Sequence, residues 1–209
     1  MASDSASPIL ETLGLFVIVF VLQGIAAMFS LGVMAAFFVL APPLESNPWT
    51  IVTSVYAHGG VGHLVSNSIG LIVFGWPIAR ATTRLRFHTF FVVTGAIAGV
   101  SQILVTGAVA SFVGGSTAGV LGASGAVFAL MGYLIAGNRV SDSVAARVEV
   151  PLWATLLAFV VLSAVITVAT GAPGVALVAH FTGFLVGLVA GRLGVLEVSR
   201  AVRSGRATA

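Results

Sequence analysis

Four polar residues in an otherwise apolar sequence could do chemistry together. Ser124 and His180 are the minimum for nucleophilic catalysis, because a serine hydroxyl attacks a carbonyl only when a base such as imidazole removes its proton. His63 and Asn67 lie four residues apart, so on a helix they share one face and could donate hydrogen bonds to a developing oxyanion. The backbone N–H of Ser124, at the start of a predicted helix, would add a third donor. No acid accompanies these residues, so the sequence supports a Ser-His dyad.

The composition puts these residues in a membrane. Of the 209 residues, 58% are hydrophobic and 7% are charged, whereas a soluble domain carries roughly a quarter charged residues. A soluble globular protein is therefore excluded. Four long uncharged stretches separate the charged residues; at about 20 residues per membrane helix, two of them hold one span each and two hold two spans each. The expected fold class is all-α, with six spans in a single membrane domain over residues 1–209 and no separate soluble domain. The predicted spans are 13–29, 58–76, 87–105, 122–137, 151–170 and 175–195.

The candidate residues share one depth. Counted from the inner flank of each span, Asn67, Ser124 and His180 lie at a height of about 20 Å at helical rise, which is about 10 Å below the outer surface. His63 lies one turn nearer the outside. The fourth span, 122–137, is too short to cross a core of about 30 Å, so we expect its outer end to begin inside the membrane. Irregular backbone at that depth requires a cavity, and this one would open outward.

The charges predict orientation and exclude several partners. The net charge is +3, and all nine basic residues are arginines that follow the second, fourth and sixth spans. The positive-inside rule places these segments and both termini in the cytoplasm of a multi-pass cell-membrane protein, and this distribution argues against nucleic acid as a partner. The chain has no cysteine, no Asp or Glu within a predicted span, and no His-Glu-x-x-His string. We therefore expect neither a metal nor a cofactor.

Two outer connections are expected between the spans. Residues 30–57 are apolar and interrupted by three prolines, so we expect them to lie partly in the membrane interface. Residues 106–121 are rich in glycine and small residues and are expected to form a loop that leads into the fourth span.

Small residues near the dyad predict close helix packing. Gly125 in span four and Gly183 and Gly187 in span six form small-residue stripes, which let two membrane helices approach closely. Such an approach is needed to bring His180 to Ser124. Phe128, one turn after Ser124, is positioned to stack on the imidazole ring.

These residues form ordered motifs that resemble the rhomboid family of intramembrane serine proteases. The resemblance runs from Pro48-Trp49 to about Val195. Its motifs are Thr53, His58-Gly-Gly-Val-Gly-His63-x-x-x-Asn67, Gly122-Ala-Ser124-Gly125 followed by Ala129-Leu-Met-Gly-Tyr133, and Ala179-His180-x-x-Gly183-x-x-x-Gly187.

The resemblance implies a six-helix bundle that cuts the transmembrane segments of other membrane proteins near their outer end, without metal or cofactor. By position, Ser124 matches the nucleophile and His180 the general base. His63, Asn67 and the Ser124 amide match the oxyanion hole. The expected partners are the bilayer and transmembrane substrates, and no oligomeric state is predicted.

Two positions depart from the family pattern. Thr50 follows Trp49 where many bacterial members carry an arginine, so a residue that anchors the first outer loop is missing. Phe128 stands where the ring under the catalytic histidine is often tyrosine; stacking survives this change and a phenolic hydrogen bond does not.

Two other functions stay open from the residues. A small transporter could use His63, Asn67 and His180 as a polar path, although the spans lack acidic residues and the chain lacks repeated halves. A catalytically silent relative could bind membrane segments, although such a protein does not need Ser124 and His180 together.

Overall fold

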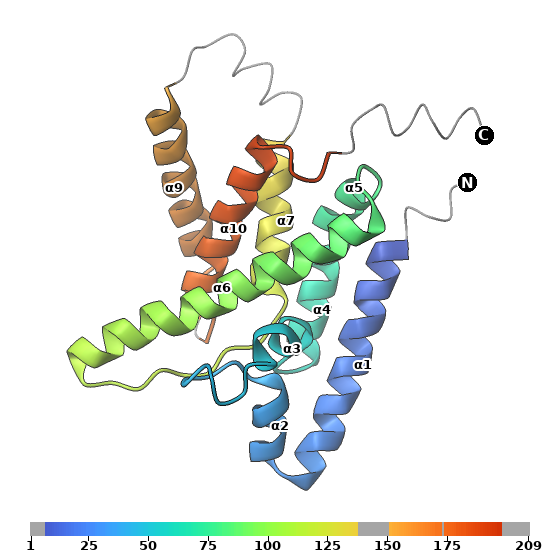
Figure 1. Ribbon diagram of the computed structural model, residues 1–209, viewed down its shortest axis with the longest axis vertical. Helices are drawn as coiled ribbons and strands as arrows, with labels where there is room; N and C mark the ends of the chain where they lie inside the picture. Colours follow the sequence, from blue (N-terminus) through green and yellow to red (C-terminus); the bar gives the residue numbers. More distant parts are fainter. Residues whose placement is uncertain (1–6, 138–150, 173, 198–209) are drawn as a thin grey trace.

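The computed structural model describes residues 7–137, 151–172 and 174–197, which fold mainly into helices (Figure 1). In chain order these are α1 (Ser7–Phe29), α2 (Leu31–Phe38), α3 (Thr50–Tyr56), α4 (Val61–Gly70), the π-helical turn η1 (Leu71–Gly75), α5 (Trp76–Ala79), α6 (Arg84–Val113), α7 (Ser124–Ala136), α9 (Leu152–Ala169) and α10 (Leu177–Arg192). The predicted all-α class is confirmed. The arginines predicted to mark the inner connection between spans four and five, and those of the C-terminal tail, lie outside the described residues.

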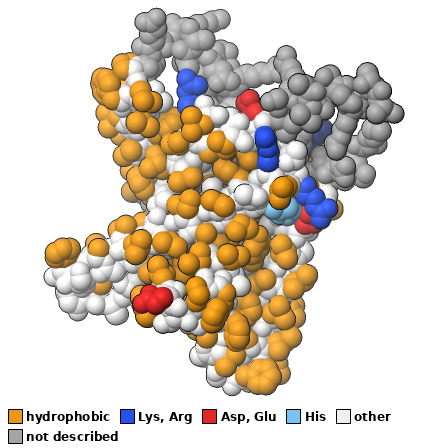
Figure 2. Space-filling model, viewed as in Figure 1, with side chains coloured by type: hydrophobic (Ala, Val, Ile, Leu, Met, Phe, Trp, Pro, Cys, Tyr) orange, Lys and Arg blue, Asp and Glu red, His pale blue; other side chains and the backbone are white. Residues whose placement is uncertain are grey.

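Among the residues that the structure describes, four helical segments are long and apolar enough to cross a membrane. They are α1, the continuous helix Val61–Ala79 formed by α4, η1 and α5, then α6 and α9. Two further apolar helices, α7 and α10, are shorter, with 13 and 16 residues. Hydrophobic side chains cover much of the described face seen in Figure 2, and most of its arginine side chains lie toward the end where α1 begins and α10 ends. This pattern is typical of a multi-pass membrane protein.

The third long helix extends beyond its predicted range. α6 has 30 residues, and it includes residues 106–113, which were expected to be loop. Thr83 begins the helix, because its side chain accepts the N–H of Arg86 at 3.3 Å. Gly114 ends it in the left-handed conformation, at φ 75°. Gly107 does not end it, since one interior glycine costs only about 1 kcal/mol and helix-compatible residues continue on both sides.

The outer segment between α1 and α4 also contains more helix than predicted. Residues 30–57, expected as an interfacial connection, include α2 and α3. Ser30 caps α2 by accepting the N–H of Val33 at 3.0 Å. α2 contributes no buried side chain, whereas α3 buries Thr50, Ser54 and Val55 and contacts α6.

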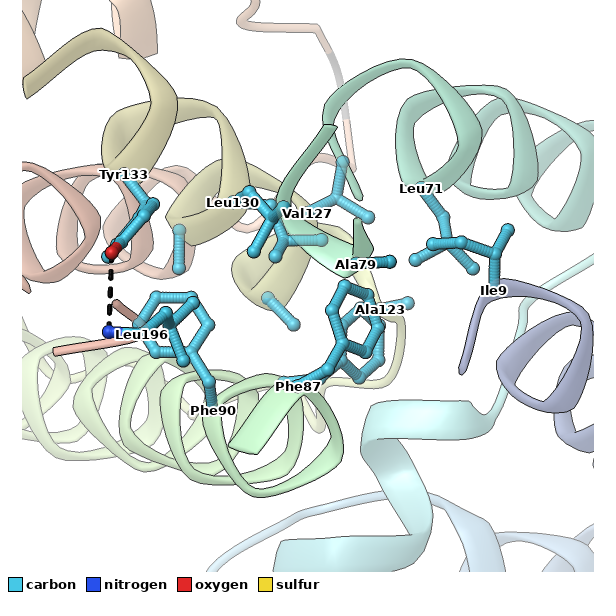
Figure 3. Close-up of a cluster of buried hydrophobic side chains, with 14 of the residues drawn as sticks. Ile9, Leu71, Ala79, Phe87, Phe90, Ala123, Val127, Leu130, Tyr133 and Leu196 are labelled. Carbon is cyan, nitrogen blue, oxygen red and sulfur yellow. Dashed lines mark hydrogen bonds between the residues drawn. The ribbon is translucent and has the colours of Figure 1, made fainter. Parts of the chain in front are cut away.

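The main core lies between α1, η1, α6 and α7 (Figure 3). Leu71, Phe87 and Leu130 come from three of these elements and are fully buried. At one edge of the core, the Tyr133 hydroxyl accepts the backbone N–H of Leu196 at 3.2 Å. This bond fixes the chain just after α10 to α7.

The ends of α1 and α6 are joined by an ionic cluster. Both the Arg84 Nε atom and the His88 Nε2 atom lie 2.7 Å from Glu11 Oε2. Glu11 belongs to the first turns of α1, and the other two residues belong to the first turns of α6. The cluster therefore ties the N-terminal ends of two long helices together.

The tightest helix contact joins α7 to α10. A Cβ atom added at Gly183 would meet the Gly125 carbonyl oxygen, and one added at Gly187 would meet the Ala129 carbonyl oxygen. From the other side, a Cβ atom at Gly132 would meet the backbone of α10. The two backbones are in direct contact here, so the small-residue stripes predicted from the sequence do face each other.

We expect Gly187→Ala to destabilise the fold by about 1–3 kcal/mol, because the added methyl group overpacks the α7–α10 contact. Thermal unfolding in detergent, followed by circular dichroism, should show a lower midpoint. Gly14→Ala is the matched control, since a Cβ atom there meets nothing within 4 Å. Equal midpoints for both variants would contradict the packing argument.

Candidate functional site

A cavity of about 740 Å³ lies between α4, α7, α10 and the loops that precede these helices. Ser124, His180, His63, Asn67 and Phe128 all line it. These residues come from three helices that are separated along the chain. The fold thus brings together every polar side chain that the sequence named as a catalytic candidate.

Ser124 is the first residue of α7. The N–H groups of the first turn of a helix have no partner within the helix, and the helix dipole is positive at this end. The Ser124 amide therefore lies where a negatively charged oxygen would be stabilised. The Ala123 cap residue supplies no side-chain hydrogen bond that would compete for these donors.

The segment before Ser124 is braced by the outer segment between α1 and α4. Leu40 and Val120 exchange two backbone hydrogen bonds, of 2.9 and 2.8 Å. The Gly122 N–H donates to the Ser54 carbonyl oxygen at 2.9 Å. The start of α7 is therefore held by backbone contacts from a part of the chain that is distant in sequence.

Gly122 makes room for the His63 ring. Its φ of +134° is a conformation that residues with a side chain rarely adopt. A Cβ atom at this position would lie 2.6 Å from His63 Cε1 and 2.8 Å from His63 Nε2. Only glycine therefore fits between the His63 ring and the start of α7.

The hydrogen bonds of His63 indicate its tautomer. The Gly59 N–H donates to His63 Nδ1 at 3.3 Å, so Nδ1 is the acceptor and the proton belongs on Nε2. Nε2 is also the ring nitrogen that lies against Gly122. His63 thus presents a donor beside the start of α7.

Asn67 lies one turn further along α4 and is almost fully buried. Its Nδ2 atom donates to the His63 carbonyl oxygen at 3.1 Å. An amide nitrogen carries two protons, so one remains for an acceptor in the cavity.

His180 stacks on Phe128. The ring centroids are 4.1 Å apart, and the ring planes differ by 22°. His180 is buried, and its Nδ1 atom has no hydrogen-bond partner. Within the described chain, no hydrogen bond joins the His180 ring to the Ser124 hydroxyl. The ring is therefore oriented by an aromatic contact rather than by an acid.

Two glutamines near the site, the buried Gln23 and the half-buried Gln102, were not among the predicted residues. Gln23 in α1 binds the His58 backbone on both sides: the His58 N–H donates to Gln23 Oε1 at 2.9 Å, and Gln23 Nε2 donates to the His58 carbonyl oxygen at 3.3 Å. Gln102 in α6 accepts the N–H of Ala179 at 3.1 Å and lines the cavity. An amide side chain inside an apolar span was the sequence signal that could have found both.

The outer segment is anchored without an arginine at position 50. The Trp49 indole N–H donates to the Ala36 carbonyl oxygen at 2.9 Å, and the Thr53 hydroxyl donates to the Phe37 carbonyl oxygen at 2.5 Å. Both acceptors belong to the last turn of α2, whose carbonyl groups have no partner within the helix. The Thr50 hydroxyl instead donates to a carbonyl oxygen within its own turn, at 2.6 Å.

The fold and the site define the class of this protein. It is a helical, multi-pass membrane protein with a serine, two histidines and an asparagine among the residues around its cavity. The chain belongs to the rhomboid family, because the family's Rhomboid domain matches residues 45–197. It is also similar to RHOMBOID-like protein 5 of Arabidopsis thaliana, with 28% identity over 148 residues. That similarity covers 70% of this chain and 44% of the relative, so the chain spans less than half of the relative's length.

We expect Gln23→Leu to lower the free energy of unfolding by about 1–3 kcal/mol, because it leaves a buried N–H and a buried carbonyl of His58 without partners. Titration of the folded protein with a denaturing detergent should measure this loss. Ser68→Ala removes only a bond to a carbonyl of its own helix and should cost much less. A Gln23→Leu variant as stable as Ser68→Ala would contradict a bracing role for the glutamine.

Proposed function

We propose that this protein is an intramembrane serine endopeptidase that cleaves the transmembrane segments of other membrane proteins near their outer ends. The observation that carries the proposal is the shared cavity, which Ser124, His180, His63 and Asn67 line from three helices. Membership of the rhomboid family supports the same reaction.

In the proposed mechanism, the Ser124 hydroxyl is the nucleophile and His180 is the general base. The His180 Nδ1 atom is buried, so Nε2 is the nitrogen available to the cavity. As Ser124 attacks the scissile carbonyl, Nε2 takes the hydroxyl proton and a tetrahedral intermediate forms. Phe128 keeps the ring in place during the transfer, because it stacks on one face of it.

Three donors would stabilise the oxyanion of that intermediate. They are the Ser124 backbone N–H, His63 Nε2–H and the second proton of Asn67 Nδ2. Fixed donors are worth more than donors in solution, because they need no reorganisation during the reaction. Gly122 supports this arrangement by leaving space for the His63 ring.

Collapse of the intermediate would release the amine half of the substrate. The His180 imidazolium returns its proton to the leaving nitrogen, which leaves an ester on Ser124. A water molecule from the cavity then loses a proton to His180 and attacks the ester. This second step releases the carboxyl half and regenerates the serine. No metal or cofactor takes part in the proposed reaction.

The six-span topology and the orientation belong to the same proposal. The four long helices and the two shorter ones, α7 and α10, would make six spans in one membrane domain over residues 1–209. Thirteen residues of α7 cover about 20 Å, so with its inner end at the surface Ser124 would lie about 10 Å below the outer surface. The arginine distribution would put both termini in the cytoplasm, so the cavity would open outward.

A silent binder of membrane segments is the second candidate. A silent binder needs no hydrogen bond between Ser124 and His180, and in the described chain none joins them. Catalytic hydrogen bonds are often long in unliganded enzymes and tighten when substrate binds, so this geometry is compatible with either function. Activity measurements separate the two.

Replacing Ser124 or His180 with alanine should each reduce peptide cleavage by at least about 100-fold, because each variant lacks one partner of the proton transfer. The measurement is cleavage of a fluorescent transmembrane peptide by purified protein in proteoliposomes. Wild-type protein should also label with a fluorophosphonate, and Ser124→Ala should not.

Ser111→Ala is the matched control, since this exposed serine at the outer end of α6 bonds only to a carbonyl of its own helix. It should cleave like the wild type. Cleavage of the peptide by Ser124→Ala at the wild-type rate would contradict the protease proposal. Binding of membrane peptides by a folded wild-type protein that neither cleaves nor labels would favour the silent binder.

We expect Phe128→Leu to lower kcat roughly two- to tenfold, because ring stacking is worth about 0.5–1.5 kcal/mol. Phe128→Tyr keeps the ring and should retain most of the activity. Steady-state kinetics on the same peptide will test this. A Phe128→Tyr variant as slow as Phe128→Leu would argue against stacking as the role of this residue.

A further inference from the structure

The first turn of α10 carries His180 but has no cap of its own. Ala176 precedes the helix and makes no side-chain cap hydrogen bond. The first hydrogen bond within the helix runs from the His180 N–H to the Ala176 carbonyl oxygen, at 3.1 Å. The N–H groups just before His180 therefore need partners from elsewhere.

One of those partners is a side chain from another helix. Gln102 of α6 accepts the Ala179 N–H through its Oε1 atom at 3.1 Å. Ala179 is buried and directly precedes His180. The bond links residues that are 77 positions apart, so it fixes the first turn of α10 against α6 rather than against its own neighbours in sequence.

The same face of α6 contacts α7 beside Ser124. Ala98 lies one turn before Gln102, and a Cβ atom added at Gly125 would be 2.5 Å from the Ala98 Cβ atom. Gly125 directly follows Ser124. α6 therefore touches the residue after the serine and the residue before the histidine at two points that are one helical turn apart. In the described chain, no other side chain of α6 makes a hydrogen bond to the α10 backbone.

We propose that Gln102 is a positioning residue that sets the height and rotation of His180 relative to Ser124. It does so because α6 contacts both α7, which carries Ser124, and α10, which carries His180. This inference rests on the proposed protease function. The glycine contacts between α7 and α10 fix how close the two backbones come. They leave axial sliding of α10 opposed mainly by packing, whereas a directional hydrogen bond from Gln102 opposes it at the turn that carries the base.

Gln102 also lines the cavity, so a role in binding substrate is the competing interpretation. The two roles differ in their kinetics. A positioning residue acts on proton transfer and changes kcat, whereas a residue that only holds substrate changes KM. Fluorophosphonate labelling adds a second measure, because a small reagent reports the activation of Ser124 without the contacts of a peptide.

The test compares two variants. Gln102→Met keeps the length of the side chain and removes the oxygen that accepts the Ala179 N–H, whereas Gln102→Glu keeps an acceptor oxygen. We expect Gln102→Met to lower both kcat and the fluorophosphonate labelling rate roughly five- to tenfold, with KM changed less than twofold. Gln102→Glu should recover at least half of the lost kcat. All variants are measured as full-length protein in proteoliposomes, and their unfolding midpoints are recorded in parallel.

Thr94→Val is the matched control. Thr94 is a buried polar residue of α6, and its hydroxyl bonds to carbonyls of its own helix at 2.7 and 3.4 Å. It should lose some stability and keep its kcat. This control separates a specific effect on His180 from the general loss of a polar group that α6 holds inside the fold.

Several outcomes would overturn the inference. If wild type cleaves the peptide and Ser124→Ala does not, an unchanged kcat in Gln102→Met would exclude a positioning role while leaving the protease function intact. A raised KM with unchanged kcat would assign Gln102 to substrate binding, and equal losses in Gln102→Met and Gln102→Glu would show that the acceptor is not what matters. A wild-type protein that neither cleaves nor labels would overturn the proposed function and this inference with it.

Discussion

The direct backbone contact between α7 and α10 is the constraint on which the site depends. Ser124 and His180 lie in the first turns of these two helices, so the separation of the helices sets the separation of the side chains. Gly183 and Gly187 allow that separation because backbone carbonyl groups of α7 lie where their side chains would be. In a membrane, where apolar surface gains nothing by leaving lipid, such close packing is the main attraction between helices. The stability of this pair and the geometry of the site therefore have the same origin.

Around this pair, the fold holds the remaining polar groups through backbone contacts. The segment leading to Ser124 is fixed by Leu40 and Ser54, and the segment leading to α4 is fixed by Gln23. Each contact satisfies backbone groups that would otherwise be buried without partners, which is costly at membrane depth. The irregular backbone that surrounds the cavity is thus stabilised by the hydrogen bonds that position the site.

The residues lining the cavity were predictable from sequence because intramembrane polar side chains are rare and motif spacing is local. Ser124, His180, His63 and Asn67 stand out against apolar neighbours. The partners of Gln23 and Gln102 were not predictable, because they lie 35 and 77 residues away and depend on how the helices pack. The length of α6 was missed for a different reason: the glycine and small residues of 106–113 are also typical of a loop, and here they continue the helix.

The length of α6 has a consequence for the surrounding lipid. A helix of 30 residues is about 45 Å long, and a typical hydrocarbon core is about 30 Å thick. α6 runs obliquely to α1 and α9 in Figure 1, and the exposed side chains near its C-terminal end, such as Val109 and Phe112, are apolar. A helix of this length tilts within the bilayer, thickens the bilayer around it or extends into the headgroup region. Membrane thickness therefore affects the tilt of α6, and α6 is the helix that contacts both α7 and α10.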